Sequence, residues 1–384
     1  MAIKTIDECF YYIQNGANIK QSEFGGGYPI TRIETTSNDK FNRDRTGYGG
    51  IIDLSKYSSY VLEDGDLLMS HINSAKYLGR TVLYKKLGDE IIIHGMNLLR
   101  LKADRNVILP EYARYSFYSS AFRSQLEKIT KKSVNQASFS VKDLKRIKLE
   151  IPEIEIQNKV VSNLNKTMHL IDLCNQIIEK LDLLIKAKFV EMFGEENFPI
   201  VSIADLVEEK ISTAKKDFMQ DSIIKYIDIS SIDNQRNVMT GYTEYILSEA
   251  PSRATQHIIK GDIVISTVRP NLKNVAITTY DDNNLVASSG FCVLRAKKCL
   301  PSYLMAIACS NEFTDAMTKA VTGANYPAIK NSDIMRYTVL LPPIELQKKF
   351  EKLTEQIDKS KSAVKQVLEK AETLKKALMQ EYFG

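Results

Sequence analysis

Apolar residues recur every seven positions along two stretches of the chain, and both stretches are predicted to be long helices. The first begins near Pro152 and carries a stripe of apolar residues: Leu164, Ile171, Ile178, Ile185 and Met192. Four more apolar residues widen this stripe: Leu170, Ile177, Leu181 and Leu184. The second stretch alternates spacings of three and four, as a coiled-coil seam does, through Leu353, Ile357, Ser360, Val364, Val367, Ala371, Leu374 and Leu378.

Two uses of these helices are open. A helix with one apolar stripe commonly packs on its own domain. However, both stretches run 38 residues, from Gln157 or Gln347 to a closing glycine, without an internal Pro or Gly. In the second stretch, charged residues occupy positions outside the apolar seam, such as Lys359, Lys361, Lys365, Glu369 and Lys370. We therefore expect the two helices to pair antiparallel as a coiled-coil spacer roughly 55–60 Å long, at about 1.5 Å per residue.

The helices belong to an internal repeat. Without any gap, residues 135–194 align with residues 325–384 at a constant offset of 190, with 17 identities in 60. Chance predicts about one identity in sixteen for ordinary composition. The identities include Arg146/Arg336, Pro152/Pro342, Gln157/Gln347 and the closing Phe193-Gly194/Phe383-Gly384. The chain therefore consists of two similar halves that end in the same module.

The segment before each helix is rich in short β-type runs and turns. The segment "GDLLMS" (65–70) parallels "GDIVIS" (261–266), and "GMNLLRLK" (95–102) parallels "GFCVLRAK" (290–297). Each Gly-Asp pair is typical of a turn that enters a buried strand, with the Asp as its cap. We expect two α+β domains, residues 1–152 and 196–342, each followed by a repeated helix, 153–195 and 343–384. An antiparallel helix pair would relate them by a pseudo-twofold axis.

The bulk composition permits many functions. The 384 residues carry a net charge of +5, which allows nucleic-acid binding but does not require it. Residues 1–150 hold 23 Lys+Arg against 17 Asp+Glu, whereas residues 199–340 hold 15 of each. Five cysteines without a CxxC pair favour a reduced, cytoplasmic protein. The chain has no apolar run long enough to span a membrane and no N-terminal leader, so we expect no membrane association.

No catalytic motif stands out. The chain has no GxxxxGK[ST] loop, no HExxH and no metal-spaced Cys/His set, and its four histidines are scattered. We expect no cofactor and no metal in this chain.

Several longer segments are typical of one family. Both helices open with related sequences, "IPEIEIQNKV" (151–160) and "LPPIELQKKF" (341–350). The second half also contains "YIDISSID" (226–233), "APSRATQHIIKGDIVISTVRP" (250–270) and "LVASSGFCVLR" (285–295). On these segments the chain resembles, over essentially its whole length, the DNA-specificity subunit of type I restriction-modification systems. The first half departs from the pattern, with "MSHINSAKYLGR" (69–80) where the second half has "ISTVRPNLKN" (265–274).

The resemblance implies a non-catalytic subunit with two target-recognition domains, each reading one half of a bipartite, asymmetric double-stranded DNA target. The helices would set the gap between half-sites and dock two methyltransferase subunits, which bring S-adenosylmethionine. Restriction subunits with ATP-driven translocation would join that complex.

Candidate DNA contacts are Arg, Lys, Asn and Gln side chains in turn-rich segments, because Arg suits guanine, Asn and Gln suit adenine, and Lys mostly holds phosphate. In the first domain they are Lys20, Gln21, Arg43, Arg45, Asn73, Lys76 and Arg80. In the second they are Lys215, Lys216, Arg236, Arg269, Asn271, Lys273 and Asn274. Loops near the domain–helix junctions add Lys131, Lys132, Asn135, Gln136, Asn325 and Tyr326. Any of these could instead be a solvated surface residue, and Tyr326 could stack on a base or pack in a hinge.

Two rivals remain. The charge balance of the second domain also suits a two-headed scaffold whose domains bind protein. An enzyme, either a nuclease or a methyltransferase, is disfavoured by the missing cofactor and metal motifs.

Overall fold

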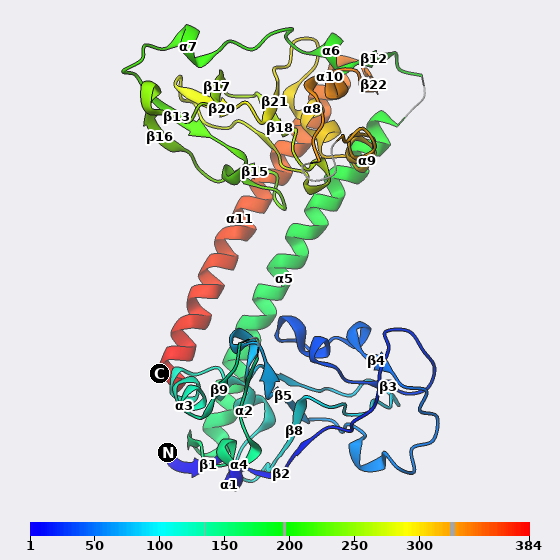
Figure 1. Ribbon diagram of the computed structural model, residues 1–384, viewed down its shortest axis with the longest axis vertical. Coiled ribbons are helices and arrows are strands. Elements are labelled where there is room, and N and C mark those ends of the chain that lie inside the picture. The colour runs from blue at the N-terminus through cyan, green and yellow to red at the C-terminus, as the bar shows by residue number, and fades with distance from the viewer. Residues whose placement is uncertain (135, 195–196, 323–326) are drawn as a thin grey trace. The chain divides into compact units, whose positions relative to one another are not determined.

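The two predicted helices are α5 (Ile154–Phe193) and α11 (Ile344–Phe383), each an unbroken 40 residues. They are the longest elements of the computed structural model, which describes residues 1–134, 136–194, 197–322 and 327–384 (Figure 1). The chain divides into two compact units. Unit 1 comprises Met1–Cys174 and Val367–Gly384, and unit 2 comprises Asn175–Gln366. Each unit therefore contains one half of each long helix.

Contacts within each unit show that the helices run antiparallel. In unit 1, Asn163 of α5 donates a hydrogen bond to the hydroxyl of Tyr382, near the end of α11, at 3.0 Å. In unit 2, Lys361 pairs with Asp182 at 2.5 Å, and the ring of Phe350, early in α11, lies 5.2 Å from that of Phe193, at the end of α5. The predicted antiparallel pairing is confirmed. A helix packed only on its own domain is excluded.

Unit 1 is a mixed α+β fold built around a four-stranded antiparallel sheet in the order β2-β8-β5-β7. A separate two-stranded antiparallel sheet consists of β1 and β11. Its strands are β1 (Ala2–Thr5), β2 (Phe10–Asn15), β3 (Pro29–Ile30), β4 (Gly47–Tyr48), β5 (Leu67–Ser70), β6 (Ile72–Asn73), β7 (Thr81–Leu83), β8 (Leu98–Ala103), β9 (Lys131–Lys132), β10 (Ala137–Ser138) and β11 (Lys148–Ile151). Its α-helices before α5 are α1 (Ile6–Cys9), α2 (Pro110–Ser116), α3 (Ser120–Ile129) and α4 (Val141–Leu144).

Unit 2 contains a three-stranded sheet, β19-β18-β21, and a four-stranded sheet, β16-β13-β20-β17, in which β13 and β20 are parallel. Its strands are β12 (Ile200–Ser202), β13 (Ile223–Ile227), β14 (Ile232–Asp233), β15 (Val238–Met239), β16 (Thr243–Ile246), β17 (Ala254–His257), β18 (Ile263–Ser266), β19 (Val275–Ile277), β20 (Leu285–Ser288), β21 (Phe291–Leu294) and β22 (Thr338–Leu340). Its shorter α-helices are α6 (Ile203–Leu206), α7 (Ala214–Asp217), α8 (Pro301–Ala308), α9 (Asn311–Lys319) and α10 (Asn331–Met335).

The repeated Gly-Asp turns are confirmed, and in each turn the buried Asp carboxylate pairs with an arginine. Gly65 and Gly261 have φ of +88° and +91°, a region that glycine occupies readily. In the first turn the carboxylate of Asp66 accepts the backbone N–H of Glu63 and pairs with the buried guanidinium of Arg100 at 2.6 Å. Unit 2 repeats both features, with Asp262 bound to Arg295 at 2.7 Å. Each ion pair thus links the start of one strand to its neighbour in the sheet. In unit 1 it links β5 to β8, and in unit 2 it links β18 to the residue that follows β21.

A buried glutamine fixes the start of each long helix. The side-chain oxygen of Gln157 accepts the backbone N–H of Leu109 at 2.8 Å, and its amide donates to the carbonyls of Val107 and Pro152. Leu109 is the N-cap of α2, whose first N–H groups lack partners within the helix. Gln347 repeats the arrangement at Leu300, the N-cap of α8, and the carbonyl of Pro342.

An aromatic contact fixes the end of each long helix. Phe383, at the end of α11, packs against Tyr112 of α2 with ring centroids 5.1 Å apart. Phe193, at the end of α5, packs against Tyr303 of α8, also at 5.1 Å. Each long helix therefore begins on the small helix of one half of the chain and ends on the equivalent helix of the other half. This explains why the closing Phe-Gly occurs twice.

Replacing Gln157 with alanine is expected to destabilise unit 1. The substitution leaves the buried N–H of Leu109 and two carbonyls without their partner, which costs about 2–3 kcal/mol. Thermal denaturation followed by circular dichroism measures the effect. Gln356→Ala on the exposed side of α11 is the matched control and should change stability by less than about 0.5 kcal/mol. Equal melting temperatures for the two variants would contradict the proposed role of the buried amide.

Candidate nucleic-acid interface

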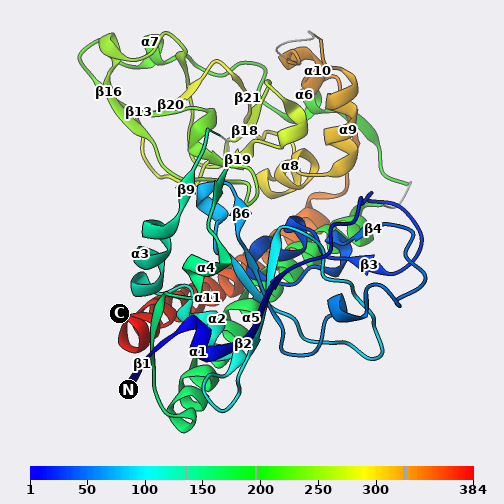
Figure 2. The same ribbon diagram turned by 60° about the horizontal axis from the view of Figure 1, so that its bottom comes forward.

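In unit 1, a small sheet brings together predicted residues from distant parts of the chain. The strand β10 lies between β6 and β9, so that Ala137 is paired with Asn73 on one side and with Lys132 on the other. At a strand spacing of about 4.8 Å, the backbones of Asn73 and Lys132 lie roughly 10 Å apart. Lys76, Lys131, Lys132 and Gln136 are exposed here, and Asn73 is half-buried. Figure 2 shows β6 and β9 extending from the part of unit 1 that holds α2 and α4.

Arg80 lies at the end of the same loop but is partly engaged. Its guanidinium stacks on the ring of Tyr77 at 4.5 Å and pairs with Asp39 at 3.2 Å, which leaves 23% of the side chain exposed. The ammonium of Lys76 also lies over the Tyr77 ring, 5.4 Å from its centroid. Tyr77 therefore positions two of the predicted cations.

Four predicted residues lie in a different region of unit 1, beside β3 and β4. Lys20 and Arg45 are exposed, and Gln21 turns inward, with its amide 3.5 Å from the carbonyl oxygen of Thr31. Arg43 binds both oxygens of Glu90 and the carbonyl of Lys85, and it lies over the rings of Phe41 and Tyr84. Its side chain is thus already occupied within the fold.

In unit 2, the predicted loop after β18 forms a compact turn. Arg269 and Asn271 are exposed, and Asn274 is half-buried. The ammonium of Lys273 binds the side-chain oxygen of Asn311, the first residue of α9, at 2.7 Å. The exposed Arg236, in the β14–β15 turn, lies 3.7 Å from Asp233.

Two asparagines that the sequence analysis did not select connect these two turns. Asn234 donates to the carbonyl of Leu272 at 2.8 Å, and Asn237 donates to the carbonyls of Lys273 and Val275. The turn that carries Arg236 is therefore bonded to the turn that carries Arg269. No spacing in the sequence indicates these bonds, because donors and acceptors are separated by 36 to 38 residues.

Lys215 and Lys216 belong to another surface of unit 2. Both are exposed on α7, next to Asp217, whose carboxylate binds the imidazole of His257 at 2.6 Å and the hydroxyl of Ser212. In Figure 1, α7 and β15 lie on opposite sides of unit 2. These lysines and the Arg236–Arg269 region therefore do not form one patch. The remaining predicted residues, Asn135, Asn325 and Tyr326, lie outside the described residues.

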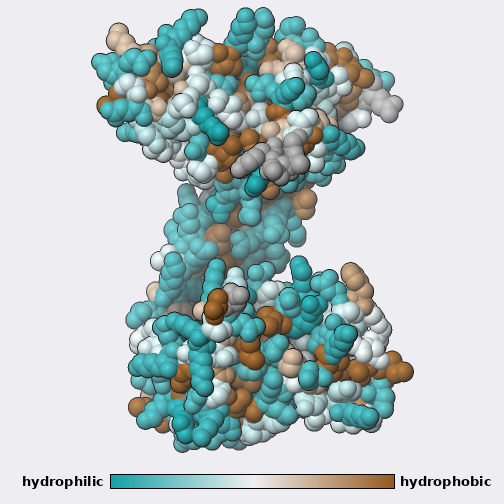
Figure 3. Space-filling model, viewed as in Figure 1, coloured by the Kyte–Doolittle hydropathy of each residue, from teal (hydrophilic) through white to brown (hydrophobic). Residues whose placement is uncertain are grey.

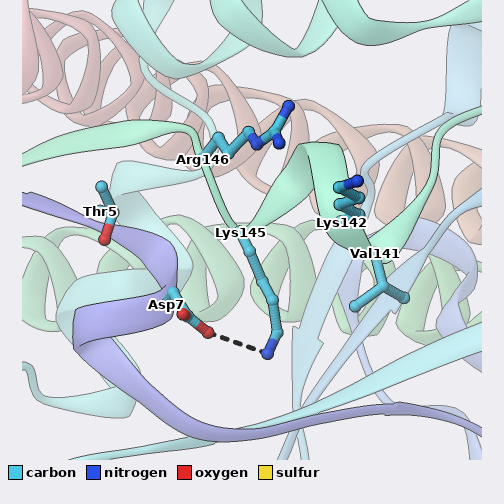
Figure 4. A pocket seen from close by; sticks show the side chains of 6 residues that line it. All are labelled: Thr5, Asp7, Val141, Lys142, Lys145 and Arg146. Carbon is cyan, nitrogen blue, oxygen red and sulfur yellow. Dashed lines mark ion pairs between the residues drawn. The ribbon is translucent and has the colours of Figure 1, made fainter.

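A basic surface pocket of about 520 Å³ was also missed by the sequence analysis. It is lined by Thr5, Asp7, Val141, Lys142, Lys145 and Arg146. Lys145 extends to Asp7 and pairs with it at 2.8 Å (Figure 4). Within the described part of the chain, Lys142 and Arg146 form no ion pair, so the pocket carries excess positive charge. In the sequence, the identity of Arg146 with Arg336 in the repeat is the feature that could have pointed to this pocket.

Two observations bear on the cysteines and on the metal-ligating residue types. Burial raises the pKa of Cys292 and Cys299 to about 12 and that of Cys9 and Cys309 to about 11, so these groups stay protonated thiols at neutral pH. Across residues 1–134, 136–194, 197–322 and 327–384, no group of three or more His, Cys, Asp or Glu side chains could hold a metal ion. Over the same residues, no helix combines the length and the apolar character needed to cross a membrane.

Comparisons with known proteins agree on one family. The type I restriction modification DNA specificity domain matches twice, over residues 1–183 and 195–373. A protein of Methanocaldococcus jannaschii, provisionally named the type I restriction enzyme MjaX specificity subunit, is 26% identical over 98% of this chain and 91% of its own. The crystal structure of a type I restriction-modification S subunit from M. genitalium superposes with a TM-score of 0.59 at 12% identity, covering all of this chain and 96% of the other.

A second solved structure, from work on complex assembly and conformational transition of the type I R-M system, has a TM-score of 0.52 at 14% identity. It covers all of this chain and 97% of its own. At such identities the two solved structures support the fold, while the doubled domain match identifies the family.

Arg43→Ala is expected to lower the melting temperature in a pH-dependent way. Arg43 holds the pKa of Glu90 at about 2, below its usual 4.5. A lowered carboxyl pKa stabilises the folded state above the unfolded pKa, and that stabilisation is lost as pH falls from about 5 towards 2. The difference in melting temperature between the variant and the natural chain should therefore be largest near pH 6–7 and shrink below pH 4. Arg45→Ala, at an exposed neighbour, is the control. A difference that does not vary with pH would contradict this role.

Proposed function

The chain belongs to the family of type I restriction-modification DNA specificity proteins, and on this premise we propose that each half reads one half of a bipartite, asymmetric DNA target. As a specificity subunit, the chain selects the DNA sequence on which a restriction-modification complex acts, and catalysis resides in partner subunits. The recognition domains are residues 1–152 and 196–342, and the repeated helices are residues 153–195 and 343–384.

The observation that carries this proposal is the duplicated attachment of two equal helices. Each 40-residue helix starts at a buried glutamine in one half and ends at an aromatic cluster in the other. A helix of this length rises about 60 Å. Since one DNA turn is about 34–36 Å, the two half-sites would be separated by several unspecified base pairs.

The exposed side chains of the two turn regions are the best-placed DNA contacts. In the second domain, Arg236, Arg269 and Asn271 are exposed on turns that are bonded to each other. In the first domain, the half-buried Asn73 and the exposed Lys76 lie beside the exposed Lys131, Lys132 and Gln136. We assign base reading to the Arg, Asn and Gln side chains and phosphate contacts to the lysines. Arg43 supports the fold of the first domain through Glu90.

Apolar residues left exposed on the long helices support docking of methyltransferase subunits. Leu170, Ile177 and Leu184 repeat every seven residues along α5, and each is 39–43% exposed. In α11, the residues equivalent to Ile177 and Leu184 are Val367 and Leu374, which are also exposed. Figure 3 shows apolar side chains among polar ones along the helices. Such a repeat suits packing against further helices. We propose that two methyltransferase subunits bind here, bring S-adenosylmethionine, and are joined by restriction subunits.

The complex of this chain with its methyltransferase partner should select a bipartite target from random double-stranded DNA. Sequencing of the bound fraction should give two short fixed blocks with a constant unspecified gap. Affinity should fall with rising salt, because each phosphate contact contributes about −0.9 to the slope of log K against log salt. One contiguous block would contradict the bipartite proposal. An absence of selection at low salt would instead favour a protein-binding scaffold, to which the equal charges of residues 199–340 are also suited.

Lengthening the helix pair should lengthen the gap. Inserting one heptad into both α5 and α11 keeps the apolar repeat and adds about 10 Å, or roughly three base pairs of DNA. The same selection from random DNA should then return unchanged blocks with a longer gap. Substitution of exposed polar residues on the helices, such as Gln356→Ala, without a change of length is the control. An unchanged gap in the lengthened protein would show that the helices do not set the spacing.

A further inference from the structure

Left-handed backbone conformations concentrate at one point of unit 2. Six described residues other than glycine have positive φ, and three of them lie in the two bonded turns: Asn237 (+53°), Arg269 (+50°) and Lys273 (+52°). Asparagine tolerates this conformation, but arginine and lysine rarely adopt it. Such residues persist only where surrounding contacts hold them, and they gather at binding sites.

Backbone hydrogen bonds hold the Arg269–Lys273 turn, both within the turn and to Pro327. The N–H of Arg269 donates to the carbonyl of Pro327 at 2.9 Å, and the N–H of Leu272 donates to the carbonyl of Arg269. Pro270 is buried. The side chain of Lys273 is tied to Asn311 of α9. Arg269 is the exposed cation of this turn, and its side chain forms no hydrogen bond or ion pair within the described part of the chain.

The β14–β15 turn binds the Arg269–Lys273 turn through two side-chain amides. Asn234 binds the carbonyl of Leu272, and Asn237 binds those of Lys273 and Val275. The bracing turn is itself fixed, because the carboxylate of Asp233 accepts the N–H groups of Gln235 and Arg236, each at 3.0 Å. The two amides thus bond to carbonyls on both sides of left-handed Lys273.

We propose that Asn234 and Asn237 are positioning residues for base recognition, which hold the turn so that Arg269 reads a guanine in the second half-site. The planar guanidinium matches the O6 and N7 acceptors of guanine in the major groove. A fixed turn presents this fork in one orientation and so favours one base over the others. This inference rests on the proposed function. It concerns one half-site only, because in unit 1 the loop between β6 and β7 makes its left-handed turn at Gly79 (φ +70°).

The test compares base preference in two variants of the full complex. Asn234→Ala/Asn237→Gly removes both amides, and glycine keeps the left-handed backbone at position 237. Asn284→Ala is the matched control, because Asn284 donates a side-chain bond of 2.9 Å to the carbonyl of Ile223 elsewhere in unit 2. Binding to targets with every base at each position is measured for both. The reference position is the guanine whose preference Arg269→Ala abolishes.

The double variant should lose about tenfold of its discrimination at that guanine, the order of one bidentate base contact. The other half-site should be unaffected, and the control should keep full discrimination. Unchanged discrimination in the double variant would overturn the proposal, as would an equal loss in the control. Should the double variant melt early, Asn234→Ala alone provides the same comparison. Failure of the natural complex to select any two-block target would instead refute the proposed function itself.

Discussion

The buried amides of Gln157 and Gln347 determine how the rest of the chain is arranged. Each satisfies the backbone N–H of the N-cap residue of a short helix, α2 or α8, and the carbonyl of the proline before a long helix. A buried amide without these partners would be costly, so the helix can start in only one place and direction. Because Tyr112 and Tyr303, in the same short helices, also receive the ends of the long helices, each short helix holds the start of one long helix and the end of the other.

This arrangement explains why the helical part of the repeat keeps a constant offset of 190 residues. The attachment points and the helix between them are constrained together, since a change in one helix would break its pairing with the other. The turns that carry Arg269 or Asn73 are attached to the strands β18 and β5, and the Arg295–Asp262 and Arg100–Asp66 pairs hold these strands in place through a buried carboxylate. Loops beyond these strands can change sequence and shape without disturbing the helices.

The sequence predicted the features that depend on local periodicity. The heptads gave both long helices, the constant offset gave the repeat, and the Gly-Asp pairs gave the turns at Gly65 and Gly261. It could not distinguish free from occupied cations, because Arg43 and Arg45 stand in the same local sequence, yet only Arg43 meets Glu90, 47 residues away. For the same reason it missed Asn234 and Asn237, whose acceptors lie in another turn. It also did not foresee the parallel pairing of β13 with β20, which joins residues about 60 positions apart.

The central claim is that each half of the chain reads its own half of the target. The most direct measurement is the binding penalty of every base substitution across the selected DNA target, for the natural complex and for Arg269→Ala. The claim predicts that penalties in one block shrink while those in the other block and the length of the gap stay the same. Equal loss of discrimination in both blocks would contradict it.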